Sequence, residues 1–225
     1  MNGIRVATFD CYGTLIDWEG GAGSFLYSLA RRFEQDPPPG RVLRERWEEI
    51  QFDLLHRDYA PYREILASSL GAWAEERGFE VPDDAAEAFA LAMESWQPFP
   101  DTVPALTTAK DAGLRLWIIS NTDRAIIAHS LRHLEVEFDG VTVAEDARAY
   151  KPSDAPFEHA LREIGSSPEE ILHVAFGFKY DIAPAQRLGM RTAWVNRHRE
   201  PAPGPERPEL EWDDLWPLAD VARGG

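Results

Sequence analysis

The sequence predicts an α/β fold in which a doubly wound parallel sheet carries a helical insertion after its first strand. The first observation is a set of short apolar runs rich in β-branched residues, which are typical of buried strands, at 4–9, 114–120, 140–145, 171–176 and 191–196. The second is a set of helical patterns of crossover length between the later runs, at 123–135, 154–165 and 181–189. Strands that alternate with helices form parallel sheets covered on both faces, and this predicts the fold class.

The interval between the first two strands differs because it contains only helical patterns. They occupy 22–35, 41–58, 61–78 and 82–96, and proline-rich or polar breaks separate them. An insertion at this point is expected to lie over the carboxyl ends of the strands, where doubly wound sheets bind ligands. We therefore predict a Rossmann-like catalytic core of residues 1–16 and 101–225 and a helical cap of residues 17–100. The tail after the last strand predicts a proline-rich loop and then a short helix within 210–221.

The composition narrows the class of partner. The 225 residues are 44% hydrophobic, which is enough for a substantial core, and their formal net charge is -16. This charge repels phosphate backbones and anionic lipid, so we expect neither nucleic acid nor a membrane surface as a partner. The single cysteine, Cys11, excludes an internal disulfide and suits a reducing compartment. Because no apolar run is typical of a signal peptide or a membrane span, we expect a cytoplasmic protein.

Polar side chains stand at the ends of four predicted strands. Asp10 closes the first strand, and Ser120 and Asn121 end the second. Lys151 follows the third strand, and Asp181 follows the fourth. The carboxyl ends of parallel strands meet at one crevice, so we expect these side chains to converge. A lysine beside a nucleophilic aspartate would keep the carboxylate ionised and offset charge that builds up in a reaction.

The same residues carry a resemblance to a known family. The segments FDCYGTLID, SNTD, YKPS and YDIAPAQRLGMRTAWVNR together resemble the four ordered motifs of the haloacid dehalogenase superfamily of hydrolases. The resemblance covers nearly the whole chain, and residues 17–100 match the helical cap that this superfamily inserts after its first motif. It implies an aspartate nucleophile at Asp10.

Two positions distinguish the chemistries found within that superfamily. Phosphatases resemble a D-x-D pattern, in which the second aspartate protonates the leaving alcohol, but this chain has Tyr12 there. A phenol with a pKa near 10 is a poor acid at neutral pH. The last motif has Ala175 and Phe176 where phosphatases present an acid for Mg²⁺. The pattern D-x-Y-G-T-L is similar to the L-2-haloacid dehalogenases, which implies a hydrolase that needs no metal and no cofactor.

This resemblance implies a mechanism in two steps. Asp10 attacks the α-carbon of a small carboxylic acid, inverts that carbon and forms an ester. Water then attacks the ester carbonyl, with Asp181 to orient it or to act as its base. Lys151 offsets the negative charge of nucleophile and substrate, while Ser120, Asn121 and turn N–H groups hold the substrate carboxylate.

These roles define two sets of candidate residues. The candidate catalytic residues are Asp10, Lys151, Asp181 and Ser120. The candidate substrate-binding residues are Tyr12, Asn121, Cys11, Glu48, Trp47 and Phe176. Because it neighbours Asp10 on a strand, the thiol of Cys11 is expected to point to the opposite face and to pack there.

Three positions depart from the dehalogenase pattern. The resemblance implies a halide-binding arginine beside a tryptophan in the cap, but the segment RERWEEIQ places Glu48 after Trp47. A carboxylate there would favour a cationic leaving group, as in the ring-opening azetidine-2-carboxylate hydrolases, unless Glu48 is an exposed residue of a cap helix. A tyrosine expected six places after Lys151 is Phe157, and a serine and an asparagine of the last motif are replaced by the run FGF.

Other interpretations therefore stay open at the level of sequence. One is a Mg²⁺-dependent phosphatase of the same superfamily, against which Tyr12 and Phe176 count. Another is a catalytically lapsed binding protein, against which the intact set of four residues counts: Asp10, Lys151, Ser120 and Asp181. The sequence also leaves open whether the chain forms a homodimer through its aromatic-rich cap.

Overall fold

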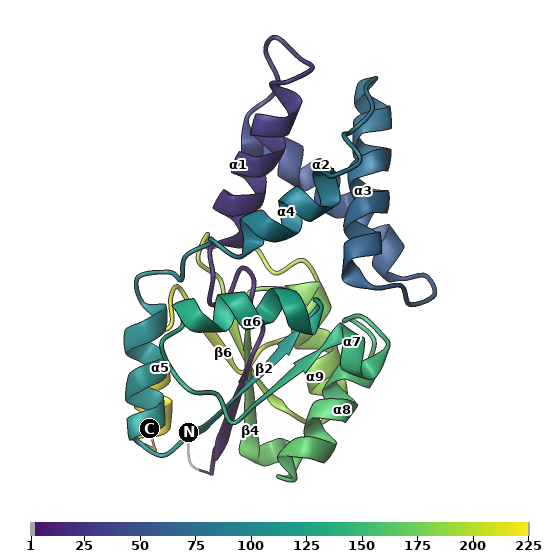
Figure 1. Ribbon diagram of the computed structural model, residues 1–225. Helices are drawn as coiled ribbons and strands as arrows, with labels where there is room; N and C mark the ends of the chain where they lie inside the picture. The colour runs from purple at the N-terminus through teal and green to yellow at the C-terminus, as the bar shows by residue number, and fades with distance from the viewer. Residues whose placement is uncertain (1–2, 225) are drawn as a thin grey trace.

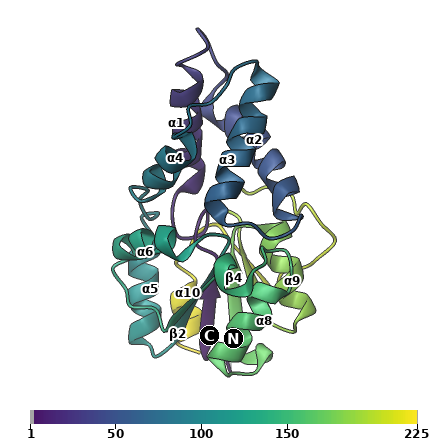
Figure 2. The same cartoon turned by 45° about the vertical axis from the view of Figure 1, so that its right-hand side comes forward.

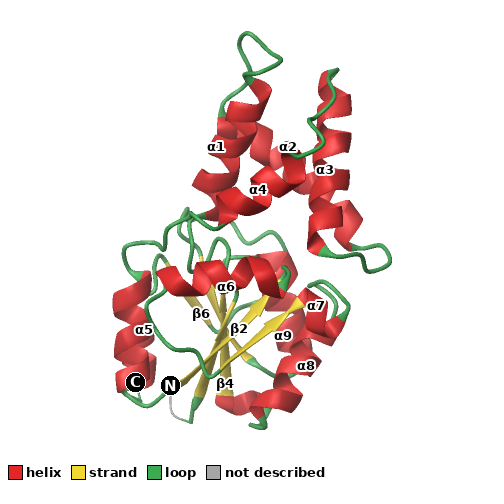
Figure 3. Cartoon of the chain, in the orientation of Figure 1, coloured by secondary structure: helices red, strands yellow, loops and turns green. Residues whose placement is uncertain are grey.

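The computed structural model describes residues 3–224 and contains a six-stranded sheet, drawn in yellow in Figure 3. The strands are β1 (Val6–Phe9), β2 (Arg115–Ser120), β3 (Gly140–Val143), β4 (Ile171–Ala175), β5 (Arg191–Val195) and β6 (Leu210–Trp212). Their order across the sheet is β3-β2-β1-β4-β5-β6, and all neighbouring strands are parallel. This arrangement confirms the predicted α/β class with a doubly wound sheet.

Strand β1 lies at the centre of the sheet between β2 and β4. All of its residues are buried, which explains the unbroken apolar run in the sequence. The register pairs Phe9 with Ile118 of β2 and with Val174 of β4, so the carboxyl ends of the three strands lie side by side. Asp10 therefore leaves the strand at the middle of this edge.

Helices cover both faces of the sheet (Figure 1). Helices α5 (Thr102–Asp111), α6 (Arg124–His133) and α10 (Leu218–Ala222) pack on one face. Helices α8 (Ala155–Ile164) and α9 (Ala183–Arg187) pack on the other. Two short elements border the site: α7 (Ala144–Ala147) follows β3, and a π-helical turn, η2 (Phe178–Ile182), follows β4. A 3₁₀ turn, η1 (Pro168–Glu170), precedes β4.

The structure corrects the prediction for the tail. The expected helix within 210–221 begins only at Leu218, and Leu210–Trp212 instead form β6. This short strand pairs with Ala193–Val195 and adds a parallel edge to the sheet. Helix α5 was likewise not among the expected elements. Its segment has a proline and several threonines, which weaken a helical pattern, but Ala105 and Leu106 bury themselves in the core.

Four helices form a separate group above the carboxyl ends of the strands (Figures 1 and 2). They are α1 (Trp18–Ala30), α2 (Gly40–Leu55), α3 (Tyr62–Arg77) and α4 (Ala85–Met93). Trp47 and Phe89 are fully buried among them, with ring centroids 5.0 Å apart, so these helices pack around an apolar centre of their own. The division into a core of residues 1–16 and 101–225 and a cap of residues 17–100 stays a prediction.

Polar contacts connect these helices with the sheet below. The carboxylate of Asp123, just after β2, accepts hydrogen bonds from the backbone N–H of Tyr62 and Arg63 at 3.0 and 3.3 Å. It thereby satisfies free donors at the start of α3. The hydroxyl of Tyr150 donates to the carbonyl of Ala60 at 2.7 Å. None of the helices within residues 3–224 is both long and apolar enough to cross a membrane.

Candidate active site

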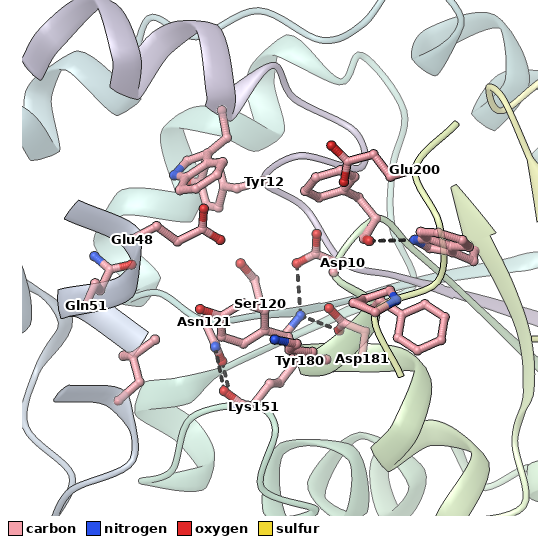
Figure 4. A pocket seen from close by; sticks show the side chains of 18 of the residues that line it. Asp10, Tyr12, Glu48, Gln51, Ser120, Asn121, Lys151, Tyr180, Asp181 and Glu200 are labelled. Carbon is pink, nitrogen blue, oxygen red and sulfur yellow. Dashed lines mark hydrogen bonds and ion pairs between the residues drawn. The ribbon is translucent and has the colours of Figure 1, made fainter. Parts of the chain in front are cut away.

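A pocket of about 250 Å³ lies between the carboxyl ends of the strands and helix α2. Asp10, Ser120, Lys151 and Asp181 all line it, so the structure brings together the four side chains that the sequence placed at strand ends. Figure 4 shows them converging on the pocket from β2 and from the segments that follow β1, α7 and β4. A volume of this size suits a ligand of few atoms, since pockets for drug-sized molecules reach about 300–1,000 Å³.

The ammonium group of Lys151 lies at the centre of the site, between three hydrogen-bond acceptors. Its Nζ donates to Asp10 Oδ1 at 2.9 Å, to Asp181 Oδ1 at 2.6 Å and to the carbonyl of Ile119 at 2.9 Å. Lys151 is 1% exposed, so these acceptors take the place of water for all three of its N–H bonds. The lysine thus neutralises part of the charge of two carboxylates and fixes the position of both.

The second oxygen of Asp10 is held from the other side. The hydroxyl of Thr14 donates to Asp10 Oδ2 at 2.7 Å and accepts from the N–H of Phe176 at 2.8 Å. Gly13 makes this turn possible because its φ is +96°, a conformation that glycine adopts without strain. A methyl group on Gly13 would also lie 2.9 Å from the ring of Phe176. The carboxylate of Asp10 is therefore fixed before any ligand arrives.

The charges in this cluster are strongly coupled. Burial disfavours the ammonium form of Lys151, but Asp10 and Asp181 outweigh it and raise the lysine pKa. Burial also disfavours the charged form of Asp181, but Lys151 and His173 outweigh it and lower its pKa. For Asp10 burial is the largest effect and raises the pKa, although Lys151 opposes it. Poor solvation of this kind makes a carboxylate more basic, which favours its use as a nucleophile.

Ser120 and Asn121 have different surroundings although they are neighbours. The side-chain amide of Asn121 donates to the carbonyl of Lys151 at 2.9 Å and accepts from its N–H at 2.7 Å. Asn121 therefore fixes the backbone of Lys151. The hydroxyl of Ser120 is buried and, among residues 3–224, has no hydrogen-bond partner. A buried hydroxyl without a partner is costly, so Ser120 is available for a ligand.

Tyr12 and Phe176 shape the wall of the pocket. The hydroxyl of Tyr12 lies 2.8 Å from Ser130 Oγ, and its ring packs edge-on against Trp96. Burial raises the pKa of Tyr12 well above its ordinary value, so the phenol stays neutral and donates no proton at neutral pH. The carbonyl of Phe176 accepts from Trp194 Nε1 at 3.0 Å, which anchors the loop after β4.

Glu48 faces the pocket from helix α2 and is not a freely exposed residue of that helix. Its Oε2 accepts from Arg44 Nη1 at 2.9 Å, and Arg44 also pairs with Glu19 at 2.7 Å. Burial raises the pKa of Glu48 to about 7, although Arg44 opposes it. Glu48 therefore changes its charge close to neutral pH.

Glu200 also lines the pocket, from the loop after β5, and no motif of the sequence indicates this position. Four carboxylates thus border the pocket, while its described lining includes two lysines and no arginine. Lys151 is already occupied by Asp10 and Asp181. Acidic side chains thus outnumber basic ones in the described lining of the pocket.

The side chains of Cys11 and Trp47 do not line the pocket, contrary to their proposed contact with substrate. Cys11 is fully buried in the apolar cluster that contains Ala7 and Phe9, and burial raises the pKa of its thiol well above the ordinary value. Trp47 turns into the centre of the helical group and donates from Nε1 to Ser69 Oγ at 3.0 Å. Trp18 forms the pocket wall on that side.

Within residues 3–224 no group of three or more His, Cys, Asp or Glu side chains is placed to hold a metal ion. Both oxygens of Asp10 are engaged, and the ammonium of Lys151 lies 2.9 Å from one of them. A cation at Asp10 would face that ammonium at close range.

A buried carboxylate clamped at the carboxyl edge of a doubly wound sheet, with helices above it, lies where enzymes of the α/β class bind and convert their ligands. The comparison with known families is more specific. The model of the haloacid dehalogenase-like hydrolases matches residues 4–189, and the chain belongs to this family.

Relatives within the family align with most of the length of this chain. Haloacetate dehalogenase H-2 from Moraxella sp. (strain B) is 28% identical over 207 residues, which cover 88% of each chain. The (S)-2-haloacid dehalogenase of Pseudomonas putida is 26% identical over 205 residues, covering 88% of this chain and 86% of the relative. The crystal structure of the L-2-haloacid dehalogenase RSc1362 superposes with a TM-score of 0.84 at 26% identity, covering 98% of this chain and 99% of that one.

Proposed function

We propose that the protein is a metal-independent hydrolase that displaces a substituent from C2 of a small carboxylic acid through an ester on Asp10. The leading form of this proposal is a 2-haloacid dehalogenase. The observation that carries it is the clamp on Asp10, in which Lys151 holds one oxygen and Thr14 the other. Tyr12, two residues on, cannot supply an acid, and a halide needs none because it leaves unprotonated.

The first step is an in-line displacement. One oxygen of the Asp10 carboxylate bonds to C2, the bond from C2 to the halogen breaks, and halide departs with the electron pair. The substrate carboxylate binds Ser120 Oγ, which has no other partner within residues 3–224. The backbone N–H groups of Cys11 and Tyr12 assist, because no acceptor for them is found among the described residues. Preorganised donors of this kind lower the barrier without rearrangement during the reaction.

The second step hydrolyses the ester. Water attacks the carbonyl carbon of the Asp10 side chain, and Asp181 takes its proton. As the bond between that carbon and the ester oxygen breaks, Asp181 returns the proton to that oxygen, the Asp10 carboxyl group is regenerated, and a 2-hydroxy acid with inverted C2 leaves. Asp181 suits this role because both of its recorded hydrogen bonds engage Oδ1. Oδ2 lies beside Gly177 at the wall of the pocket.

The test is halide release from L-2-chloropropionate in buffer with EDTA. The wild-type protein is expected to release chloride, and Asp10→Asn is expected to release none, because an amide is a poor nucleophile. Asn matches Asp in shape, so equal urea midpoints for the two proteins would show that folding does not cause the difference. Chloride release by Asp10→Asn at the wild-type rate would refute the role of Asp10.

A second candidate is favoured by Glu48 and by the absence of arginine among the described pocket residues. An anionic wall suits a leaving group that departs as an amine. In a carboxylic acid with a protonated ring nitrogen on C2, such as azetidine-2-carboxylate, Asp10 bonds to C2 and the C2–N bond breaks. The electron pair stays on nitrogen, which remains tethered as an amine. Ester hydrolysis then follows as before.

Glu48 variants distinguish the two candidates. Glu48→Gln keeps the size of the side chain but removes its charge, so ring opening is expected to fall while chloride release stays equal or rises. If chloride release falls with ring opening unchanged, Glu48 does not select an amine. Both activities require Asp10, so Asp10→Asn is the shared negative control.

A further inference from the structure

His173 is a buried ionisable residue that the proposed steps do not use. It lies on β4, is fully buried and sits directly behind the catalytic cluster. Its Nε2 is 3.1 Å from Asp181 Oδ1, and its Nδ1 is 2.9 Å from Thr8 Oγ1 on β1. The ring also packs edge-on against Phe157 of α8, with centroids 5.1 Å apart. Each of the two ring nitrogens thus has one hydrogen-bond partner.

The partners decide where the imidazole proton lies. An ionised carboxylate only accepts hydrogen bonds, so Nε2 must carry a hydrogen and donate to Asp181. Nδ1 is hydrogen-bonded to the hydroxyl of Thr8, which can donate or accept there. Thr8, His173, Asp181, Lys151 and Asp10 form one continuous chain of hydrogen bonds across β1 and β4.

This chain of hydrogen bonds fixes the carboxylate of Asp181, which does not lie on a regular helix or strand. Asp181 belongs to the π-helical turn η2, an irregular piece of backbone between β4 and α9. Lys151 and His173 both donate to its Oδ1 and thereby set the plane of the carboxylate. Its Oδ2 is directed toward Gly177, where a methyl group would lie 2.6 Å away. With one donor only, the carboxylate could rotate about Lys151 and lose this direction.

We propose that His173 is a positioning residue for the second step, which holds Asp181 so that Oδ2 faces the water that hydrolyses the ester. This inference rests on the proposed ester route. His173 acts as a hydrogen-bond donor and takes no proton in the reaction. A displacement of about 1 Å in such a group can lower a rate by about 10²-fold.

Two variants separate this role from packing. His173→Phe keeps a ring against Phe157 but removes the donor, and His173→Gln keeps a neutral N–H donor and an acceptor. With L-2-chloropropionate in excess, His173→Phe is expected to accumulate the Asp10 ester, seen as added mass on the intact protein. Its ester hydrolysis should be about 10- to 100-fold slower, with little change in ester formation. His173→Gln is expected to stay within a few-fold of wild type.

Other outcomes overturn the proposal. If His173→Phe forms and hydrolyses the ester at wild-type rates, or slows both steps equally, His173 does not position Asp181. The same conclusion follows if His173→Gln is as impaired as His173→Phe while remaining folded by its urea midpoint. If His173→Phe does not fold, Thr8→Val provides the second variant, because it removes only the partner of Nδ1 and is expected to slow hydrolysis to a smaller extent.

A measurement without substrate keeps this proposal distinct from the ester route itself. Nitrogen-15 NMR of the wild-type protein at pH 7 is expected to show a hydrogen on Nε2 of His173. An Nε2 without a hydrogen would refute the proposal even if the ester is observed. If the wild-type protein forms no ester from any 2-substituted acid, the proposed function fails, and the NMR result then reports the contact with Asp181 alone.

Discussion

The clearest quantitative prediction concerns the charge of Glu48. Its pKa is about 7 against an ordinary 4.5, because burial opposes ionisation more than Arg44 favours it. The native state therefore binds more protons than the unfolded state between about pH 4.5 and pH 7, and stability falls as pH rises through this window. The difference in pKa corresponds to at most about 3 kcal/mol. Since the side chain is 31% exposed, we expect roughly 1 to 3 kcal/mol.

Glu48→Gln removes this titration, so its stability relative to wild type should change with pH. The variant is expected to gain roughly 1 to 3 kcal/mol relative to wild type between pH 5 and pH 8. Urea unfolding followed by tryptophan fluorescence at both pH values measures the change, and constant effects of the substitution cancel. An unchanged difference would refute the raised pKa. A change of opposite sign would show that the ion pair with Arg44 outweighs burial.

Three further predictions concern the walls and centre of the site. Gly177→Ala places a methyl group 2.6 Å from Asp181 Oδ2, so kcat should fall about 10²-fold with little change in the urea midpoint. An unaltered kcat would show that Oδ2 is not used. Lys151→Met leaves Asp10 and Asp181 as uncompensated buried carboxylates, and urea unfolding at pH 8 should show a loss of about 3–5 kcal/mol that shrinks toward pH 4 as one carboxyl takes a proton. A loss independent of pH would contradict the ion pairing. Ser120→Ala removes a hydroxyl without a partner in the described structure, so stability should stay within about 0.5 kcal/mol while KM rises about tenfold. An unchanged KM would exclude Ser120 from substrate binding.

The sequence predicted the elements of the fold that have strong local patterns. The central strand was predictable because Val6–Phe9 are buried on both faces and every residue is apolar or β-branched. Strand β6 was missed because Leu210–Trp212 have only three residues and follow a proline-rich loop. Their pairing with β5 is a tertiary contact, and no local pattern marks it.

For the candidate site, too, some residues could be predicted from the sequence and others could not. Side chains at the ends of strands were predictable, because parallel topology alone brings Asp10, Ser120 and Asp181 to one edge. Side chains from helix α2 were not, since a rotation of about 100° per residue separates Trp47, which is fully buried, from Glu48, which faces the pocket. The role of His173 was not predictable either. A histidine within an apolar strand is expected to be a core residue, and only its contacts with Thr8 and Asp181 indicate another role.

The central claim is an ester on Asp10, and a single turnover in oxygen-18 water tests it most directly. With protein in excess over L-2-chloropropionate, water attacks the side-chain carbonyl, so one labelled oxygen is expected in the peptide that contains Asp10. The product hydroxyl should then carry the unlabelled oxygen of the original carboxylate. Label in the product with none in the Asp10 peptide would mean that water attacks C2 directly, and it would contradict the ester route.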